Sequence, residues 1–188
     1  MMSQGASHPI TLLTASSNSC PWCGGKLTTL LELAVNHPSL QFLSLSGEKF
    51  KVETCVICSC YDVVYMDVSL SGEPTWSTYN KKPDYLPEID LDDYDDGYLT
   101  VSHLFRLSAK PRNSYHAAHW TLNSTNSQVG GHPSWIQDAY YPDCPCCSNH
   151  MTFIGQLDWE EVEEQGEGIY YMFVCPDCLI TATIFQQT

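Results

Sequence analysis

Short stretches rich in Val, Ile, Leu, Tyr and Thr run through this chain, and clusters of Gly, Pro, Asn and Ser separate them. Alternating apolar and polar positions with such boundaries are typical of half-buried strands. We therefore expect a mainly β protein, of the β-rich α+β kind. The predicted strands cover residues 26–33, 50–54, 61–69, 151–158, 168–175 and 181–188.

Other parts of the chain give weaker signals. Residues 1–19 carry many Ser, Thr, Asn and Gln side chains and predict a weakly structured arm with one strand near 10–13. Residues 71–97 contain three prolines that forbid an uninterrupted central strand, so we expect an irregular stretch. Residues 98–108 favour a strand, with a short helix as the alternative.

The cysteines carry the strongest pattern in the sequence. Eight of the ten form four Cys-x-x-Cys pairs, and the segments between successive pairs are similar in length at 24–54 and 148–174. Superimposing the two halves aligns Cys20, Cys23, Cys55 and Cys58 with Cys144, Cys147, Cys175 and Cys178, and Leu27, Leu30 and Leu33 with Met151, Ile154 and Leu157. This self-similarity predicts an internal duplication. We divide the chain into an arm (1–19), a first half (20–97) and a second half (98–188).

Each half is predicted to hold one structural zinc ion on four cysteines. A Cys-x-x-Cys turn directs two thiolates to one point, and two such turns complete a tetrahedron around Zn²⁺. Four protein ligands leave no position for water or substrate, so both sites are expected to be zinc-ribbon-like and structural. Small units of this size often need such a metal for stability.

Two other uses of the cysteines are less consistent with the pattern. A redox Cys-x-x-Cys pair should begin a helix in a βαβ unit, which the sequence lacks. Iron–sulfur proteins space their cysteines differently, and disulfides are rare in a reducing compartment. The two remaining cysteines, Cys60 and Cys146, align with Ile180 and Trp22, so we expect small buried hydrophobic residues there.

The chain is strongly acidic, with 22 Asp and Glu residues, 8 Lys and Arg residues, and a net charge of −14. No Lys or Arg follows Arg112. Nucleic acid is therefore a poor partner, and a basic protein or peptide is a better one. Acidity that only maintains solubility is the alternative. Neither a secretory signal nor a membrane-spanning run is apparent, and we expect a cytoplasmic protein.

Residues 88–97 contain six acidic residues. We interpret this segment as a solvated loop, with an acidic lip for a cationic partner as its functional alternative. The spacing does not match a calcium-binding loop. The side chains that would form the lip are Asp92, Asp93, Asp95 and Asp96.

The second half resembles the YwqG-like family of bacterial proteins and, through its GGHPSW element, programmed cell death protein 2 and its ribosome-assembly relatives. The similar features are Gly130, Gly131 and Pro133, a strand reaching Gln156, and the segment 168–173. The resemblance implies a duplicated β-rich fold. It also implies a chaperone-like role for a basic ribosomal protein, or an immunity role against a toxin.

The sequence thus favours a protein-binding module over an enzyme. An enzyme or RNA-processing factor is the alternative, but no convincing nucleophile–base pair, phosphate loop or open metal site is apparent. His116 and His119 lack the adjacent Glu of a zinc protease. We expect a partner-binding groove formed by Trp135 and Ile136, with Trp76 and Tyr79 as companions and the acidic loops at its rim.

Overall fold

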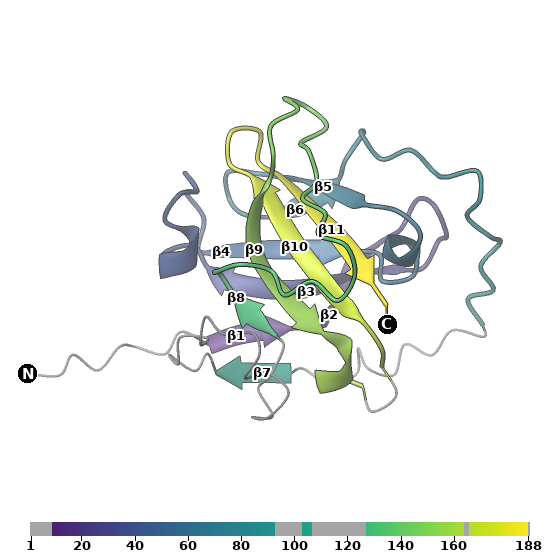
Figure 1. Cartoon of the computed structure of the whole chain (residues 1–188). Helices are drawn as coiled ribbons and strands as arrows, with labels where there is room; N and C mark the ends of the chain where they lie inside the picture. The colour runs from purple at the N-terminus through teal and green to yellow at the C-terminus, as the bar shows by residue number, and fades with distance from the viewer. Residues whose placement is uncertain (1–8, 93–102, 107–126, 164–165, 188) are drawn as a thin grey trace, which may run out of the picture.

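The structure is a computed structural model that describes residues 9–92, 103–106, 127–163 and 166–187. It is mainly β, and its strands form two antiparallel sheets (Figure 1). The first sheet has the order β2-β3-β1-β7, with β4 paired to β3. Its strands are β1 (Pro9–Leu12), β2 (Thr14–Ser19), β3 (Lys26–Ala34), β4 (Lys49–Thr54) and β7 (His103–Arg106).

The second sheet has the order β6-β5-β11-β10-β9-β8. Its strands are β5 (Val64–Val68), β6 (Pro74–Trp76), β8 (Gln128–Val129), β9 (Thr152–Asp158), β10 (Ile169–Cys175) and β11 (Ile180–Gln186). The six strands with the stronger sequence signals are confirmed as β3, β4, β5, β9, β10 and β11. The strands expected near 10–13 and within 98–108 correspond to β1 and β7. β6 and β8 were not predicted. Both lie at sheet edges, where Pro74 is tolerated because an edge strand need not donate every backbone N–H.

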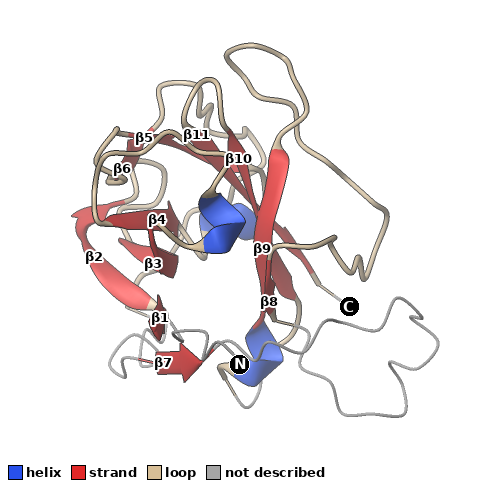
Figure 2. Ribbon diagram, turned by 90° about the vertical axis from the view of Figure 1, so that its left-hand side faces the viewer, coloured by secondary structure: helices blue, strands red, loops and turns tan. Residues whose placement is uncertain are grey.

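The two sheets pack face to face, with their strands crossing steeply (Figures 1 and 2). The central core lies between them and takes side chains from both. β3 contributes Leu30 and Leu33, and β9 contributes Ile154 and Leu157. These are two of the aligned pairs of the predicted repeat, so equivalent positions of the two halves meet in one core.

The strand pairings mix the two sequence halves. β5 and β6 precede the predicted boundary at residue 97, yet they belong to the second sheet, where β5 pairs with β11. β7 follows that boundary and pairs with β1 in the first sheet. The halves are therefore interleaved rather than laid end to end, and each sheet contains strands from both.

The N-terminal arm is more ordered than the sequence predicted. Residues 9–19 form β1 and β2, and both strands pair with β3. β2 lies at a sheet edge and is largely exposed, so its side chains are polar. A search for alternating hydrophobic residues therefore does not identify this strand. Residues 1–8 lie outside the described residues.

The described helices are short 3₁₀ turns: η1 (Pro38–Leu40), η2 (Cys58–Cys60) and η5 (Trp159–Glu161). No helix in the described ranges has the length and apolar character needed to cross a bilayer. The acidic excursion after β9 begins with η5, where the Asp158 side chain accepts a hydrogen bond from Glu160 N at 3.1 Å.

Candidate metal centres

The first group of four cysteines lies where two loops meet. Cys20 and Cys23 belong to the turn between β2 and β3, and Cys55 and Cys58 follow the end of β4. Since β3 and β4 are antiparallel neighbours, the start of one strand lies beside the end of the other. The sheet therefore brings both turns to one point, as the spacing predicted.

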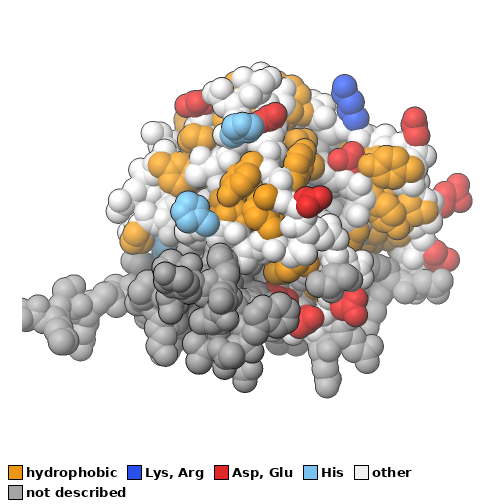
Figure 3. Space-filling model, in the orientation of Figure 1, with side chains coloured by type: hydrophobic (Ala, Val, Ile, Leu, Met, Phe, Trp, Pro, Cys, Tyr) orange, Lys and Arg blue, Asp and Glu red, His pale blue; other side chains and the backbone are white. Residues whose placement is uncertain are grey.

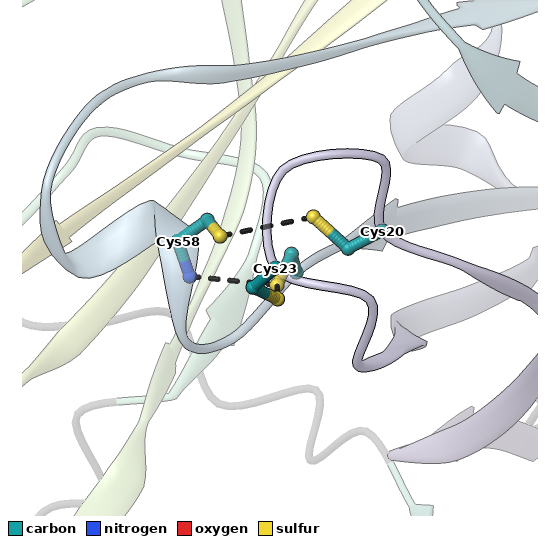
Figure 4. Close-up of side chains that lie close together, drawn as sticks. Cys20, Cys23 and Cys58 are labelled. Atoms are coloured by element: carbon teal, nitrogen blue, oxygen red, sulfur yellow. Dashed lines mark hydrogen bonds between the residues drawn. The ribbon is translucent and has the colours of Figure 1, made fainter. Parts of the chain in front are cut away.

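The sulfur atoms have the spacing of a tetrahedral zinc site. Cys20 Sγ lies 3.7 Å from Cys58 Sγ (Figure 4). Cys23 Sγ lies 3.6 Å from Cys55 Sγ. A tetrahedron with zinc–sulfur bonds of about 2.3 Å has sulfur–sulfur edges of about 3.8 Å. A disulfide would require about 2.05 Å, so these cysteines are not oxidised to one another.

Backbone N–H groups point at the sulfurs of this first group. Trp22 N donates to Cys20 Sγ, Gly25 N donates to Cys23 Sγ, and Cys58 N donates to Cys55 Sγ, each at 3.4 Å. Such donors stabilise thiolates, which are the metal-binding form of cysteine. The two turns thus supply N–H groups that hydrogen-bond to three of the sulfurs and would stabilise them as metal-bound thiolates.

The second group repeats this arrangement in the other sheet. Cys144 and Cys147 precede β9, Cys175 ends β10, and Cys178 lies in the turn to β11. Cys147 Sγ is 3.7 Å from Cys175 Sγ. In each group, all four sulfurs lie within 4.8 Å of one another. Two Cys₄ groups that could hold metal ions, one in each half of the chain, are confirmed.

All four Cys-x-x-Cys turns share one hydrogen bond. The residue after the second cysteine donates its N–H to the carbonyl of the first cysteine. The bonds are Gly24 N to Cys20 O, Ser59 N to Cys55 O, Ser148 N to Cys144 O and Leu179 N to Cys175 O, at 2.8 to 2.9 Å. The duplication therefore extends to backbone geometry.

Three of the four turns also place the residue after the second cysteine in the left-handed region. The φ angles are +82° at Gly24, +60° at Ser148 and +52° at Leu179. Only glycine adopts this conformation without a steric cost. Ser148 and Leu179 therefore carry backbone strain that the rest of each turn must offset.

Close packing separates the acidities of the thiols in the first group. Hydrogen bonds from Cys20 and the other thiols lower the pKa of Cys23. The pKa values of Cys58 and Cys55 are raised, in both cases chiefly by the hydrogen bond to Cys20. A divalent cation among the four sulfurs would stabilise the thiolate form of all of them.

The two groups differ in their exposure to solvent. Cys20, Cys55 and Cys58 are buried in a hydrophobic cluster with Trp22 and Leu86. In the second group, Cys144 and Cys175 are buried, whereas Cys147 is exposed. A metal ion in the second group would therefore be more accessible to a competing ligand.

The prediction that the spare thiols are buried is wrong. Cys60 and Cys146 are both exposed. Cys60 lies in η2, and its Sγ donates a hydrogen bond to Val56 O at 3.2 Å while the residue as a whole is exposed. Cys146 lies at the tip of its Cys-x-x-Cys turn, which we call a knuckle. Its alignment with the buried Trp22 gave the wrong prediction of burial, because another segment covers the first knuckle, which contains Trp22.

That covering segment is residues 82–92, which lead into the acidic stretch and include its first residues. Leu86 belongs to the hydrophobic cluster of the first cysteine group, and Lys82 Nζ donates to Trp22 O at 2.9 Å. A Cβ built on Gly25 would lie 3.2 Å from the Leu91 side chain. The segment therefore crosses over the first knuckle and presents Asp92 to solvent. Asp93, Asp95 and Asp96 lie outside the described residues.

The predicted partner-binding aromatics lie in two places. Trp76 of β6 packs edge-on against Trp22, with ring centroids 5.3 Å apart, beside the first cysteine group. Trp135 instead packs on Tyr171 at 4.5 Å and on Phe173 at 6.1 Å, within the hydrophobic cluster of the second group. Ile136 is exposed next to it. The structure thus places Trp76 and Trp135 in different clusters.

Residues 134–138 are fastened to three neighbouring strands by buried side chains. Gln156 of β9 accepts a hydrogen bond from Ser134 N at 2.8 Å. Tyr171 of β10 donates to Ser134 O at 2.8 Å and accepts from Ile136 N at 3.1 Å. Gln186 of β11 donates to Asp138 O at 2.9 Å. This set of contacts fixes the position of Trp135. The sequence signal for this anchoring is the presence of a glutamine, Gln156 or Gln186, within an otherwise hydrophobic strand.

This segment and the residues that follow it form an apolar surface, which we call the aromatic surface. It consists of the half-buried Trp135 and the exposed Ile136, Tyr140 and Tyr141, and Tyr141 packs edge-on against Trp135 at 5.4 Å. Figure 3 shows hydrophobic side chains gathered on the face in front of the second sheet, with acidic side chains among them and few basic ones. The predicted histidine pair, His116 and His119, lies outside the described residues.

Acidic groups lie beside the aromatic surface. Burial raises the pKa of Tyr65 to about 12, and the nearby groups that add to the shift include Tyr140, Asp62 and Asp143. Asp143 also pairs with His150, with Nδ1 and Oδ1 2.6 Å apart. Asp138 is exposed in the same loop. Because no Lys or Arg follows Arg112, this part of the chain has no basic side chain to balance these acids.

The chain is similar to an uncharacterized protein, YpfL, of Salmonella typhimurium. The two are 37% identical over 174 residues, which is 90% of this chain and 39% of that protein. The chain therefore spans well under half the length of this relative. A comparison with protein-family models finds no match, and a comparison with solved structures finds no significant one.

Proposed function

We propose that this chain is a zinc-stabilised protein-binding module that holds or neutralises a basic protein. In each cysteine group, four sulfurs lie within 4.8 Å of one another and could hold a metal ion, and an exposed aromatic surface with acidic neighbours lies directly beside the second group. This adjacency carries the proposal. The resemblance to chaperone-like and immunity-like proteins agrees with it, and the chain's own residues argue for it as follows.

The metal ions in this proposal have a structural role. Zinc suits four thiolates, and four protein ligands leave no open position for water. Each group lies where the end of one strand meets the start of its neighbour, within a hydrophobic cluster. The bound ion would therefore tie the loops to the sheets and hold the surfaces that these loops present. Loss of the ion should disturb those surfaces together with the fold.

The aromatic surface has the composition of a protein-binding site. Tyr and Trp are enriched in interfaces, because they bury a large area and lose little conformational entropy. Ile136, Tyr140 and Tyr141 are 37%, 49% and 43% exposed, so they are available to a partner. Asp62, Asp138 and Asp143 give the neighbourhood a negative charge. A partner with basic residues around an apolar centre is complementary to this arrangement.

The test uses the metal-loaded chain as bait in an extract of its native cells. Three baits are compared by quantitative mass spectrometry: the wild type, an Ile136→Ala/Tyr140→Ala double variant, and Leu70→Ala. Leu70 is 61% exposed in the loop between β5 and β6, so it is a matched apolar control away from the aromatic surface.

We expect a basic protein that the wild type and Leu70→Ala capture equally and that the double variant captures at least tenfold less. Its capture should weaken as salt is raised, because salt screens exposed charges. If no captured protein depends on Ile136 and Tyr140, the proposed interface is wrong. Circular dichroism and metal content of each bait must match, since a folding defect would mimic a loss of binding.

A further inference from the structure

A polar cavity of about 220 Å³ lies on the outer face of the first sheet. Phe50 and Val52 of β4 enter the central core, so Lys51 and Glu53 alternate to the opposite face. Thr29 pairs with Glu53 across β3 and β4 and shares that face. The cavity therefore lies on the opposite side of the sandwich from the aromatic surface and is independent of it.

Two irregularities in strand pairing shape this cavity. The β2–β3 register shifts between Ala15 and Ser19, which moves residues 16–18 out of the ladder and makes them one wall. The β3–β4 register shifts between Thr29 and Leu31, directly beside Glu53. Bulges of this kind redirect side chains and are common next to functional sites. Both bulges here are adjacent to the same carboxylate.

Glu53 is the unusual residue of this cavity. It is 4% exposed, and its Oε1 has no hydrogen-bond partner among the described residues. Burial raises the pKa of Glu53, and hydrogen bonds from the Ser16 and Asn18 side chains offset only part of this effect. Neither side chain donates to Oε1. A buried carboxylate oxygen without a donor is costly, and native proteins rarely keep one without a reason.

The other charged groups around the cavity are already paired. Lys51 Nζ lies 2.8 Å from a Glu73 oxygen, and Lys49 Nζ lies 2.6 Å from a Glu32 oxygen. Glu32, Glu53 and Glu73 line the cavity together with the single base Lys51. The lining therefore has an excess of negative charge, and Glu53 is the carboxylate whose oxygen is left without a donor.

We propose that this cavity binds an organic cation with N–H donors, a primary ammonium or a guanidinium group, and that Glu53 is its counter-ion. Such a group donates several hydrogen bonds, and the hydroxyl oxygens of Thr14, Ser16 and Thr29 can accept the remaining ones. A metal ion fits less well. Hard cations need several converging carboxylate oxygens, and within the described residues only the cysteine groups bring three metal ligands together.

Calorimetric titration of the metal-loaded chain with methylguanidinium and with n-butylammonium tests this proposal. We expect saturable binding of one cation per chain. Glu53→Gln keeps the size of the side chain and removes its charge, and it should weaken binding at least about tenfold. Glu88→Gln is the matched control, because Glu88 is exposed and does not line the cavity, and its affinity should equal that of the wild type.

Two further measurements keep the test valid if Glu53→Gln folds poorly. Ser16→Arg places a tethered guanidinium in the cavity wall, so it should abolish binding of the added cation while the chain stays folded. In the unmodified chain, the carboxyl carbon resonance of Glu53 should move on titration. The proposal is overturned if neither cation binds saturably, if Glu53 does not respond, or if Ca²⁺ or Mn²⁺ binds there instead.

The cation can come from a free amine or from a protein side chain. Cadaverine represents the first source, and the peptides acetyl-Gly-Lys-Gly-amide and acetyl-Gly-Arg-Gly-amide represent the second. Tighter binding of cadaverine assigns the cavity to a metabolite, and tighter binding of a peptide assigns it to a basic polypeptide. Each result supports the shared chemistry, and neither depends on the aromatic surface.

Discussion

Tyr171→Phe removes one oxygen atom from the centre of the second sheet and tests how residues 134–138 are held. The Tyr171 side chain is fully buried, and its hydroxyl makes two hydrogen bonds, one to Ser134 O and one from Ile136 N. The phenyl ring that remains keeps its packing against Trp135. The substitution therefore isolates the polar contacts from the hydrophobic ones.

The expected loss of stability follows from those two contacts. A neutral hydrogen bond contributes about 0.5–1.5 kcal/mol net, so two of them contribute about 1–3 kcal/mol. Ser134 is only half-buried and Ile136 is exposed, so water can replace part of what is lost. We therefore expect a decrease of about 1–2 kcal/mol in the free energy of unfolding. For a chain of this length the melting temperature should fall by about 2–8 °C.

Urea unfolding of the metal-loaded chain, followed by circular dichroism, measures this change. Acrylamide quenching of tryptophan fluorescence should rise at the same time, because Trp135 loses its fixed position. Tyr140→Phe is the control, since Tyr140 is 49% exposed and should change stability by less than about 0.5 kcal/mol. Equal stability and equal quenching for Tyr171→Phe and Tyr140→Phe would refute the anchoring role of Tyr171.

Three more predictions concern the knuckles and the core. Gly24→Ala should lower stability by about 1 kcal/mol in thermal melts, and Ser148→Gly at the equivalent position should raise it, because both residues are left-handed. Leu30→Ala should cost about 2–5 kcal/mol in urea unfolding, since Leu30 is fully buried in the central core. A colorimetric chelator should remove the metal of the second group first, because Cys147 is exposed; release in a single phase would contradict this.

The metal ligands could be predicted from the sequence because their signal is local and repeated. Cys20 and Cys23 are separated by two residues on one turn, and the same spacing occurs four times, so the number of arrangements that fit is small. The strands next to them were predictable for the same reason. Leu30 and Ile154 align in the repeat, and both entered the core as this alignment indicated.

The features that the sequence did not reveal depend on contacts between distant segments. β2 is polar because it lies at an edge, and only its pairing with β3 identifies it as a strand. The exposure of Cys146 depends on which knuckle the segment before Asp92 covers. Glu53 lies in a strand with ordinary alternation of apolar and polar residues. The cavity beside its buried carboxylate is shaped by two bulges, which the pattern of a single strand does not encode.

Native mass spectrometry of the chain purified without added metal tests the central claim most directly, because one spectrum reports the identity and number of bound ions and the oxidation of the cysteines. The account predicts two zinc ions per folded chain and no disulfide. Substitution of Cys58 by Ser should remove one ion, and substitution of Cys60 by Ser should remove none. A folded chain with less than one metal ion, or with the eight cysteines oxidised in pairs, would contradict the account.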